Sequence, residues 1–310
     1  MTYTTLDAPL LEHTERSSAR PLPAGLVAAR ADVIAAARDL LAIPETTLTR
    51  TWVWIDGGEE EVRYGAYRAA EALEAAEIEA RAAASAGDAA ERRAARMIGP
   101  STAARWDLSG LLLPLEEAVL DADPGNDEWS VRLTMGHIIG SQRGYAWSAA
   151  WRLAQGVDAA APAQPMSPPE SFWDAMPDDA TAEAVGTFDD LRGRLDAILD
   201  LGMERLAGLP DDRLALPTRW SGFPVTLGFR IGRWSSHIRE HTIQVEKTLA
   251  MLGHVPTEPA RLARHLLAAY GRAEAAVFGR LGVDEAVARI AQGAAEARVA
   301  VRSAKKAAGV

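Results

Sequence analysis

Apolar side chains recur at intervals of three and four residues along most of the chain, a spacing that predicts helices rather than strands. One helix is expected over residues 25–41. Residues 59–96 are dominated by alanine, glutamate and arginine, so they predict one long helix or two adjoining ones. Two further amphipathic helices are predicted at residues 260–281 and 285–306. We therefore expect an all-α protein.

Four more helical patterns follow one another in the middle of the chain. Pro114 interrupts the first, so we expect a kink or an early helix end there. Gly253 follows the fourth, in the position of a helix-ending glycine. Together the four patterns predict a four-helix bundle. They cover residues 108–119, 129–155, 188–206 and 227–252.

These patterns divide the chain into four predicted segments. Residues 1–23 are largely polar and predict a flexible leader. A helical N-terminal extension is expected at 24–99, the four-helix bundle at 100–253 and the C-terminal helices at 254–310. Within the bundle, a proline-rich connector at 162–169 separates the second helix from the third.

Composition narrows the function. The hydrophobic content of 48% is enough for a sizeable core, and the formal charge of −10 disfavours nucleic acid and anionic lipid as partners. The chain has no cysteine, so disulfides and thiolate metal ligands are excluded. It also lacks an apolar run long enough to span a bilayer and an N-terminal signal pattern. We predict a cytoplasmic protein that acts on a small-molecule substrate.

The histidines carry the most specific chemical signal. His237 and His241 are four residues apart, which places both imidazoles on one face of a predicted helix. Ile238 and Val245 border that face, so we expect the pair to point partly into the bundle, where a shared metal ion would offset the cost of burying two neutral rings. His137, on another predicted bundle helix, is the natural third ligand.

Three glycines surround His137 at intervals of four residues. Each weakens a helix by about 1 kcal/mol relative to alanine, so a packing reason is expected. Such a strip allows either the close approach of another element or an open space beside a metal. The glycines are Gly136, Gly140 and Gly144.

Two other interpretations of the histidines are open. In the first, the three histidines are ordinary core or surface residues that bind no metal. We assume this for the remaining histidines, which have no partner at ligand spacing: His13, His254 and His265. In the second, the helix matches the H-x-x-E-H pattern of inverted zincin peptidases, with Glu240 as the general base. The third ligand would then be Glu274 or Glu296, but the strands typical of such peptidases are not predicted.

Residues 128–137, with Trp-Ser-Val ahead of His137, and residues 233–249, with His-x-x-x-His followed by Gln244, together resemble the two signature helices of the DinB/YfiT-like superfamily. The resemblance covers residues 102–253. It implies an up-up-down-down four-helix bundle with a three-histidine site for zinc or nickel, and a homodimer. It also implies thiol-dependent transferases and isomerases, including mycothiol-dependent maleylpyruvate isomerase, and no DNA binding.

Three neutral imidazoles would leave a divalent ion with an open coordination position, as in catalytic zinc sites. Such an ion activates either water or the thiolate of a small cofactor such as mycothiol. We therefore predict a metal-dependent thiol transferase or isomerase, with a metal-dependent hydrolase as a close variant. The competing class is a non-catalytic metal-binding or ligand-sensing protein. An open, polar pocket beside the site would favour catalysis, and a plugged one the structural role.

Residues next to the ligand face are further candidates. Glu240 would orient a ligand imidazole or accept a proton, and Gln244 lies about one turn beyond His241. Arg233 and Arg239 would hold an anionic cofactor or substrate, although each charged residue here is also explained as an exposed helix position. Aromatic residues that would line an entrance, or else belong to the core, are Phe172, Trp173 and Trp234.

Overall fold

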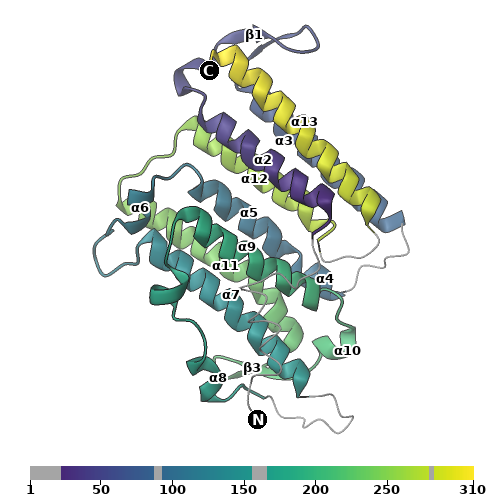
Figure 1. Ribbon diagram of the computed structural model, residues 1–310, viewed down its shortest axis with the longest axis vertical. Coiled ribbons are helices and arrows are strands. Elements are labelled where there is room, and N and C mark those ends of the chain that lie inside the picture. Colours follow the sequence, from purple (N-terminus) through teal and green to yellow (C-terminus); the bar gives the residue numbers. More distant parts are fainter. Residues whose placement is uncertain (1–21, 87–92, 156–165, 279–282) are drawn as a thin grey trace. The chain divides into compact units, whose positions relative to one another are not determined.

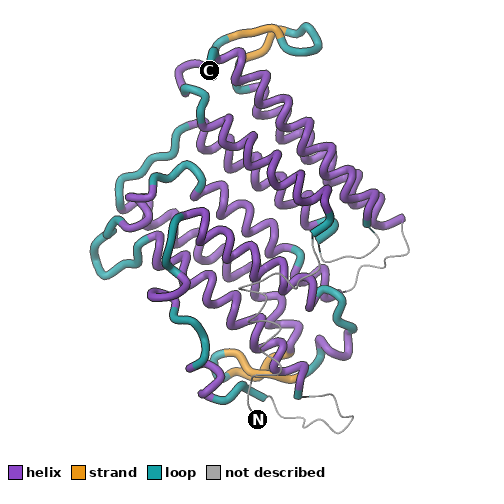
Figure 2. Tube along the Cα trace, viewed as in Figure 1, coloured by secondary structure: helices purple, strands orange, loops and turns teal. Residues whose placement is uncertain are grey.

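The computed structural model describes residues 22–86, 93–155, 166–278 and 283–310. Helices supply nearly all of the regular structure in these ranges, and strands form only two short hairpins (Figure 2). The predicted all-α class is confirmed. Nearly all of the predicted leader and the first half of the predicted proline-rich connector lie outside the described residues. Among the described helices, none combines the length and apolarity needed to cross a membrane.

One compact unit, unit 1, contains Glu116–Gly253 and the described part of Glu91–Ser101. Its long helices are α7 (Val131–Ala154), α9 (Phe188–Leu206) and α11 (Leu227–Met251), and α7 packs against both of the others (Figure 1). The shorter elements are α4 (Arg93–Ile98), α6 (Glu117–Asp121), α8 (Glu170–Asp174), the single π-helical turn η3 (Asp179–Glu183), α10 (Asp211–Leu214), and the antiparallel strands β3 (Pro217–Trp220) and β4 (Phe223–Thr226).

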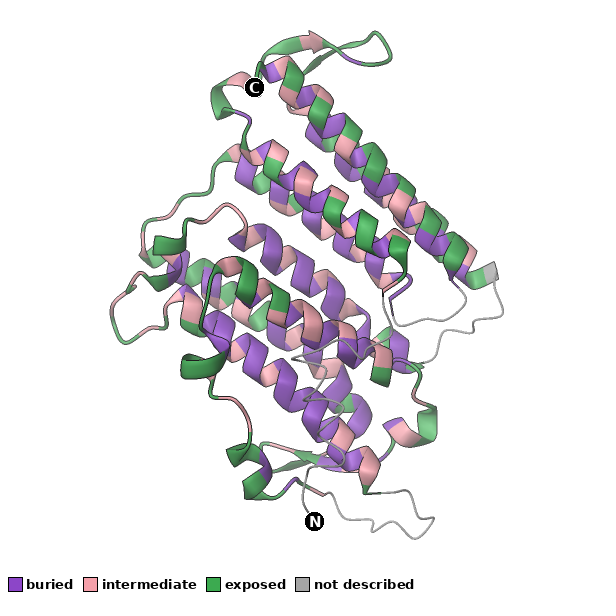
Figure 3. Cartoon of the chain, viewed as in Figure 1, coloured by how far each residue is buried: buried purple, intermediate pink, exposed green. Residues whose placement is uncertain are grey.

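Local sequence explains where the three long helices begin. Each is preceded by a residue whose hydroxyl accepts a backbone N–H of the first turn: Ser130 for α7, Thr187 for α9 and Thr226 for α11. Gly253 follows α11 with a φ of +71°, as its position in the sequence predicts. Figure 3 shows α7 buried along most of its length, so it is the central helix of unit 1.

A hairpin that the hydrophobic pattern does not predict precedes α11. Its two-residue turn, Ser221-Gly222, has positive φ at both positions, +45° and +85°, as the tightest hairpin turns require. Trp220 and Phe223 pair on either side of this turn. The hairpin therefore holds Trp220 near the N-terminal end of α11.

The other compact unit, unit 2, contains the described parts of Leu22–Ala90, Thr102–Leu115 and His254–Val310. Its helices α2 (Ala24–Leu41), α3 (Tyr64–Ala86), α12 (Glu258–Ala275) and α13 (Asp284–Ala308) pack against one another, and α5 (Pro100–Leu112) joins α12. The remaining elements are the 3-10 turn η2 (Glu45–Thr47) and the strands β1 (Thr51–Val53) and β2 (Glu59–Glu61). Helices from before and after unit 1 in the described sequence thus share one core. The domain boundaries predicted from sequence, and the up-up-down-down topology, stay predictions.

A buried ionic cluster holds unit 2 together. Glu274 on α12 is fully buried and accepts a hydrogen bond from Nε of Arg30 at 2.8 Å. The Trp106 indole N–H also donates to it, and Arg105 lies 3.4 Å away. These partners neutralise the carboxylate. A structural role therefore accounts for Glu274, one of the two glutamates that the peptidase interpretation considers as a third metal ligand.

The predicted helix over residues 59–96 is wrong at its beginning. Glu59–Glu61 forms strand β2, which pairs with Thr51–Val53, and α3 begins only at Tyr64. The reason is a turn at Asp56-Gly57, where Gly57 has a φ of +89° and the Asp56 carboxylate accepts the N–H of Gly58. Pairing with the neighbouring strand β1 overrides the helix propensity of three glutamates.

Two glycines of α9 give a matched test of packing in unit 1. A methyl group at Gly202 would overlap the indole ring of Trp234, whereas at the exposed Gly193 it would meet no described atom within 4 Å. Gly202→Ala should therefore destabilise unit 1 by about 1–3 kcal/mol. Gly193→Ala should stabilise it by up to about 1 kcal/mol through helix propensity. Urea unfolding followed by tryptophan fluorescence measures both. Equal stability of the two variants would contradict this packing.

Candidate metal centre

The structure brings the three predicted histidines together from two helices of unit 1. His137 lies on α7, and His237 and His241 lie one turn apart on α11. The Nε2 atoms of His237 and His241 are 3.1 Å apart, and one ligand nitrogen from each ring lies within 4.8 Å of the others. The His137 ring centre is 4.7 Å from that of His241 and 5.3 Å from that of His237. The three rings therefore face one common point.

Two of the rings are oriented by acceptors on their far side. Nδ1 of His137 donates to a carboxylate oxygen of Asp179 at 3.0 Å, and Nδ1 of His241 donates to the amide oxygen of Gln244 at 2.7 Å. With the proton held on Nδ1, each ring keeps its Nε2 lone pair free. Acceptors of this kind fix the tautomer and raise the basicity of histidine ligands in metal sites.

His237 is the buried member of the group, with 6% of its surface exposed. Burial, and next the neighbouring His241 and His137, lower the pKa of His237 to about 3. Burial also lowers the pKa of His241. Both rings are therefore neutral at pH 7, as ligand binding requires. The Nδ1 of His237 is buried and has no hydrogen-bond partner among the described residues, and its ring packs against Tyr145 at 5.4 Å.

The geometry and the donor set fit a divalent transition metal. Zinc–nitrogen bonds of about 2.0–2.1 Å place tetrahedral ligand nitrogens about 3.3 Å apart, close to the 3.1 Å between His237 and His241. Imidazole nitrogen suits zinc, nickel, copper and iron. Without such a partner, two buried imidazole nitrogens face each other and can share only one proton. A metal ion would satisfy both lone pairs at once.

The glycine strip of α7 explains how Asp179 reaches His137. The turn η3 lies directly against Gly136 and Gly140, where a methyl group on either glycine would overlap atoms of Asp179. A buried ion pair between Arg143 of α7 and Glu183 anchors the other end of η3. Sequence reasoning missed Asp179, although the glycine strip was a sign that some element approaches this face closely.

The other residues predicted near the site take defined places on α11. Glu240 accepts hydrogen bonds from both terminal nitrogens of Arg233, at 2.7 and 2.8 Å, and these lower the pKa of Glu240. Its side chain is half exposed, and Arg239 is exposed. Gln244 contacts His241 directly. A catalytic role for Glu240 and Gln244, and a cofactor-binding role for Arg233 and Arg239, stay predictions.

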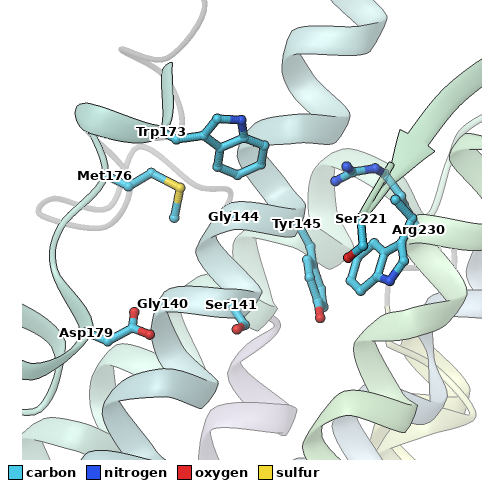
Figure 4. A pocket seen from close by; sticks show the side chains of 10 residues that line it. Gly140, Ser141, Gly144, Tyr145, Trp173, Met176, Asp179, Ser221 and Arg230 are labelled. Atoms are coloured by element: carbon cyan, nitrogen blue, oxygen red, sulfur yellow. The ribbon is translucent and has the colours of Figure 1, made fainter. Parts of the chain in front are cut away.

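A cavity of about 370 Å³ opens in unit 1 beside the histidines (Figure 4). Asp179 lines it, as does Ser141, whose hydroxyl lies 3.5 Å from Nε2 of His137. Of the aromatic residues considered for an entrance, Trp173 lines the cavity, whereas Phe172 and Trp234 are buried in the core. The other lining residues are Gly140, Gly144, Tyr145, Met176, Trp220, Ser221 and Arg230.

A helical unit with three convergent histidines and an adjoining cavity is compatible with a metal site. Residues 102–245 match the sequence model of the DinB superfamily, which supports a DinB-like assignment for this region. All three histidines lie inside the match, which confirms the family expected from the sequence. Neither a curated protein nor a solved structure matches the chain.

Gly140→Ala tests whether the Asp179 carboxylate supports the site. The added methyl group would displace that carboxylate from His137, because its nearest neighbours are all atoms of Asp179. We expect the dissociation constant for Zn²⁺ to rise about 10–100-fold, the usual effect of losing a partner of a metal-bound histidine. Competition with a chromophoric chelator measures this constant.

Two variants control for other effects of the methyl group. Gly144→Ala, one turn further along α7, would press on the flexible end of Met176 at 3.2 Å, with Trp173 at an ordinary contact distance of 3.7 Å, and should leave zinc affinity almost unchanged. In an Asp179→Ala background, Gly140→Ala should have little further effect, because the overlapping carboxylate is gone. Additive losses in the double variant would show that the methyl group acts by another route.

Proposed function

We propose that this protein is a metal-dependent enzyme in which His137, His237 and His241 hold one zinc or nickel ion. We further propose that it uses a low-molecular-weight thiol such as mycothiol in a transferase or isomerase reaction. The cavity next to the histidines carries the proposal. The match to the DinB superfamily supports it, because thiol-dependent transferases and isomerases are among the activities expected of that family.

The shape of the site favours catalysis over a purely structural metal. A structural site would be closed off by packed side chains, whereas here Ser141 and Asp179 line a cavity and also contact His137. Three protein ligands leave room for a fourth. The site thus has space for a guest molecule next to the proposed ion.

The side chains around the cavity have distinct parts in the proposal. A bound ion would supply Lewis-acid chemistry, lowering the pKa of a water or thiol in its open position. Asp179 and Gln244 hold two of the ligand rings in the correct tautomer. Burial raises the pKa of Tyr145, so its phenol remains a hydrogen-bond donor at neutral pH. The Arg233–Glu240 ion pair on α11 remains partly exposed and carries no net charge.

Metal content tests the ligand set. The purified protein should contain about one zinc or nickel ion per chain, and His137→Ala should lose nearly all of it, since two imidazoles alone bind weakly. His265→Ala, an exposed histidine of α12, is the matched control and should keep its metal. Inductively coupled plasma mass spectrometry gives the stoichiometry. Equal metal in both variants would remove His137 from the site.

Thiol dependence tests the reaction class. With mycothiol and maleylpyruvate, or mycothiol and a chromogenic electrophile, we expect turnover that requires both the metal and the thiol. Removing either should abolish it, and so should His137→Ala. Metal-dependent turnover of an ester or amide that ignores added thiol would favour the hydrolase variant. A metal-loaded protein inactive with every electrophile would favour the non-catalytic class.

A further inference from the structure

Arg230 of α11 is a buried cation that has no carboxylate partner among the described residues. It is 6% exposed. Nε donates to the carbonyl oxygen of Arg219 at 2.8 Å, Nη2 donates to the same oxygen, and the guanidinium lies 5.4 Å from the centre of the Trp220 ring. A neutral carbonyl and an aromatic face stabilise a guanidinium less than a carboxylate does. Its charge is therefore only partly compensated.

Two other buried arginines of the described chain have the carboxylate partner that Arg230 lacks. Arg143 is paired with Glu183, and Arg105 lies beside Glu274. Arg152 also has no carboxylate partner, but it does not line the cavity. Burial lowers the pKa of Arg230 below its ordinary value, and an arginine remains protonated at neutral pH all the same. Arg230 thus combines burial, positive charge and access to the cavity.

Hydrogen bonding leaves one end of the Arg230 guanidinium available. Because Nε and Nη2 are used on the carbonyl of Arg219, the remaining nitrogen, Nη1, is free to donate to a guest. Figure 4 shows Arg230 and Asp179 on opposite sides of the cavity, with Ser141 and Tyr145 between them. A guest bound to Arg230 would therefore extend toward the side where His137 lies.

The walls of the cavity favour an apolar body for that guest. Trp173 and Met176 line one part of it, and Tyr145 and Trp220 another, with their ring centres 5.0 Å apart. Such surfaces bind apolar and planar groups. A volume of about 370 Å³ is at the small end of the range for small-molecule sites.

We propose that Arg230 recognises the carboxylate of a small, partly apolar organic acid whose body lies between these walls and reaches Ser141 beside His137. The proposal names the substrate class of the same site and so rests on the proposed function. One guanidinium matches one carboxylate.

Calorimetric titration of the metal-loaded, full-length protein with 3-phenylpropanoate and with 3-phenylpropanamide tests this proposal. We expect the acid to bind about tenfold or more tightly than the amide, because a charge-assisted hydrogen bond is lost in the amide. Arg230→Gln should remove the preference, and Arg230→Lys should restore part of it. Arg219→Gln removes an exposed arginine side chain from the neighbouring hairpin and should leave the preference intact.

Repeating the titrations after chelator treatment separates this proposal from the metal site. A preference for the acid that persists without metal and disappears in Arg230→Gln supports the proposal even if the protein binds no zinc or nickel. Binding that requires the metal and is unaffected by Arg230→Gln would place the carboxylate on the ion and overturn it. Equal affinity of the unaltered protein for acid and amide would also overturn it, without relying on any variant to fold.

Discussion

The convergence of three imidazole nitrogens from two helices is the constraint on which the structure of the site depends. Two of them come from helix geometry alone, because His237 and His241 are one turn apart on α11. The third depends on how α7 packs against α11, which brings His137 within reach of the pair. Burial lowers the pKa of His237 and of His241 and so keeps these two rings neutral, and neutral rings buried without a shared partner are costly. Helix packing and the charge state of these rings are therefore coupled in this unit.

The same packing extends outward from the ligands. Glycines are unfavourable inside a buried helix such as α7, yet they let η3 lie close enough for Asp179 to contact His137. The buried pair of Arg143 and Glu183 holds η3 in that place. On the opposite side of the cavity, the β3–β4 hairpin provides the carbonyl and the ring that fix Arg230. The glycines thus lower the helix stability of α7 at the positions where other parts of the site lie against it.

Many features of the fold and of the site could be predicted from the sequence because they depend on local periodicity. The long helices, the end of α11 at Gly253 and the pairing of His237 with His241 all follow from spacing along one segment. Asp179 was missed because it lies 42 residues from His137, in a π-helical turn with no periodic pattern. Both hairpins were missed as well, since strands of three or four residues carry too little pattern and depend on their turns and cross-strand pairing.

X-ray absorption spectroscopy of the zinc-loaded protein tests the central claim most directly, because it reads the ligands of the ion without requiring a substrate. The site described here predicts three imidazole nitrogens at about 2.0–2.1 Å together with one exchangeable ligand, such as a water oxygen. A spectrum with a single imidazole, or with oxygen ligands alone, would show that the ion binds elsewhere and would contradict the account.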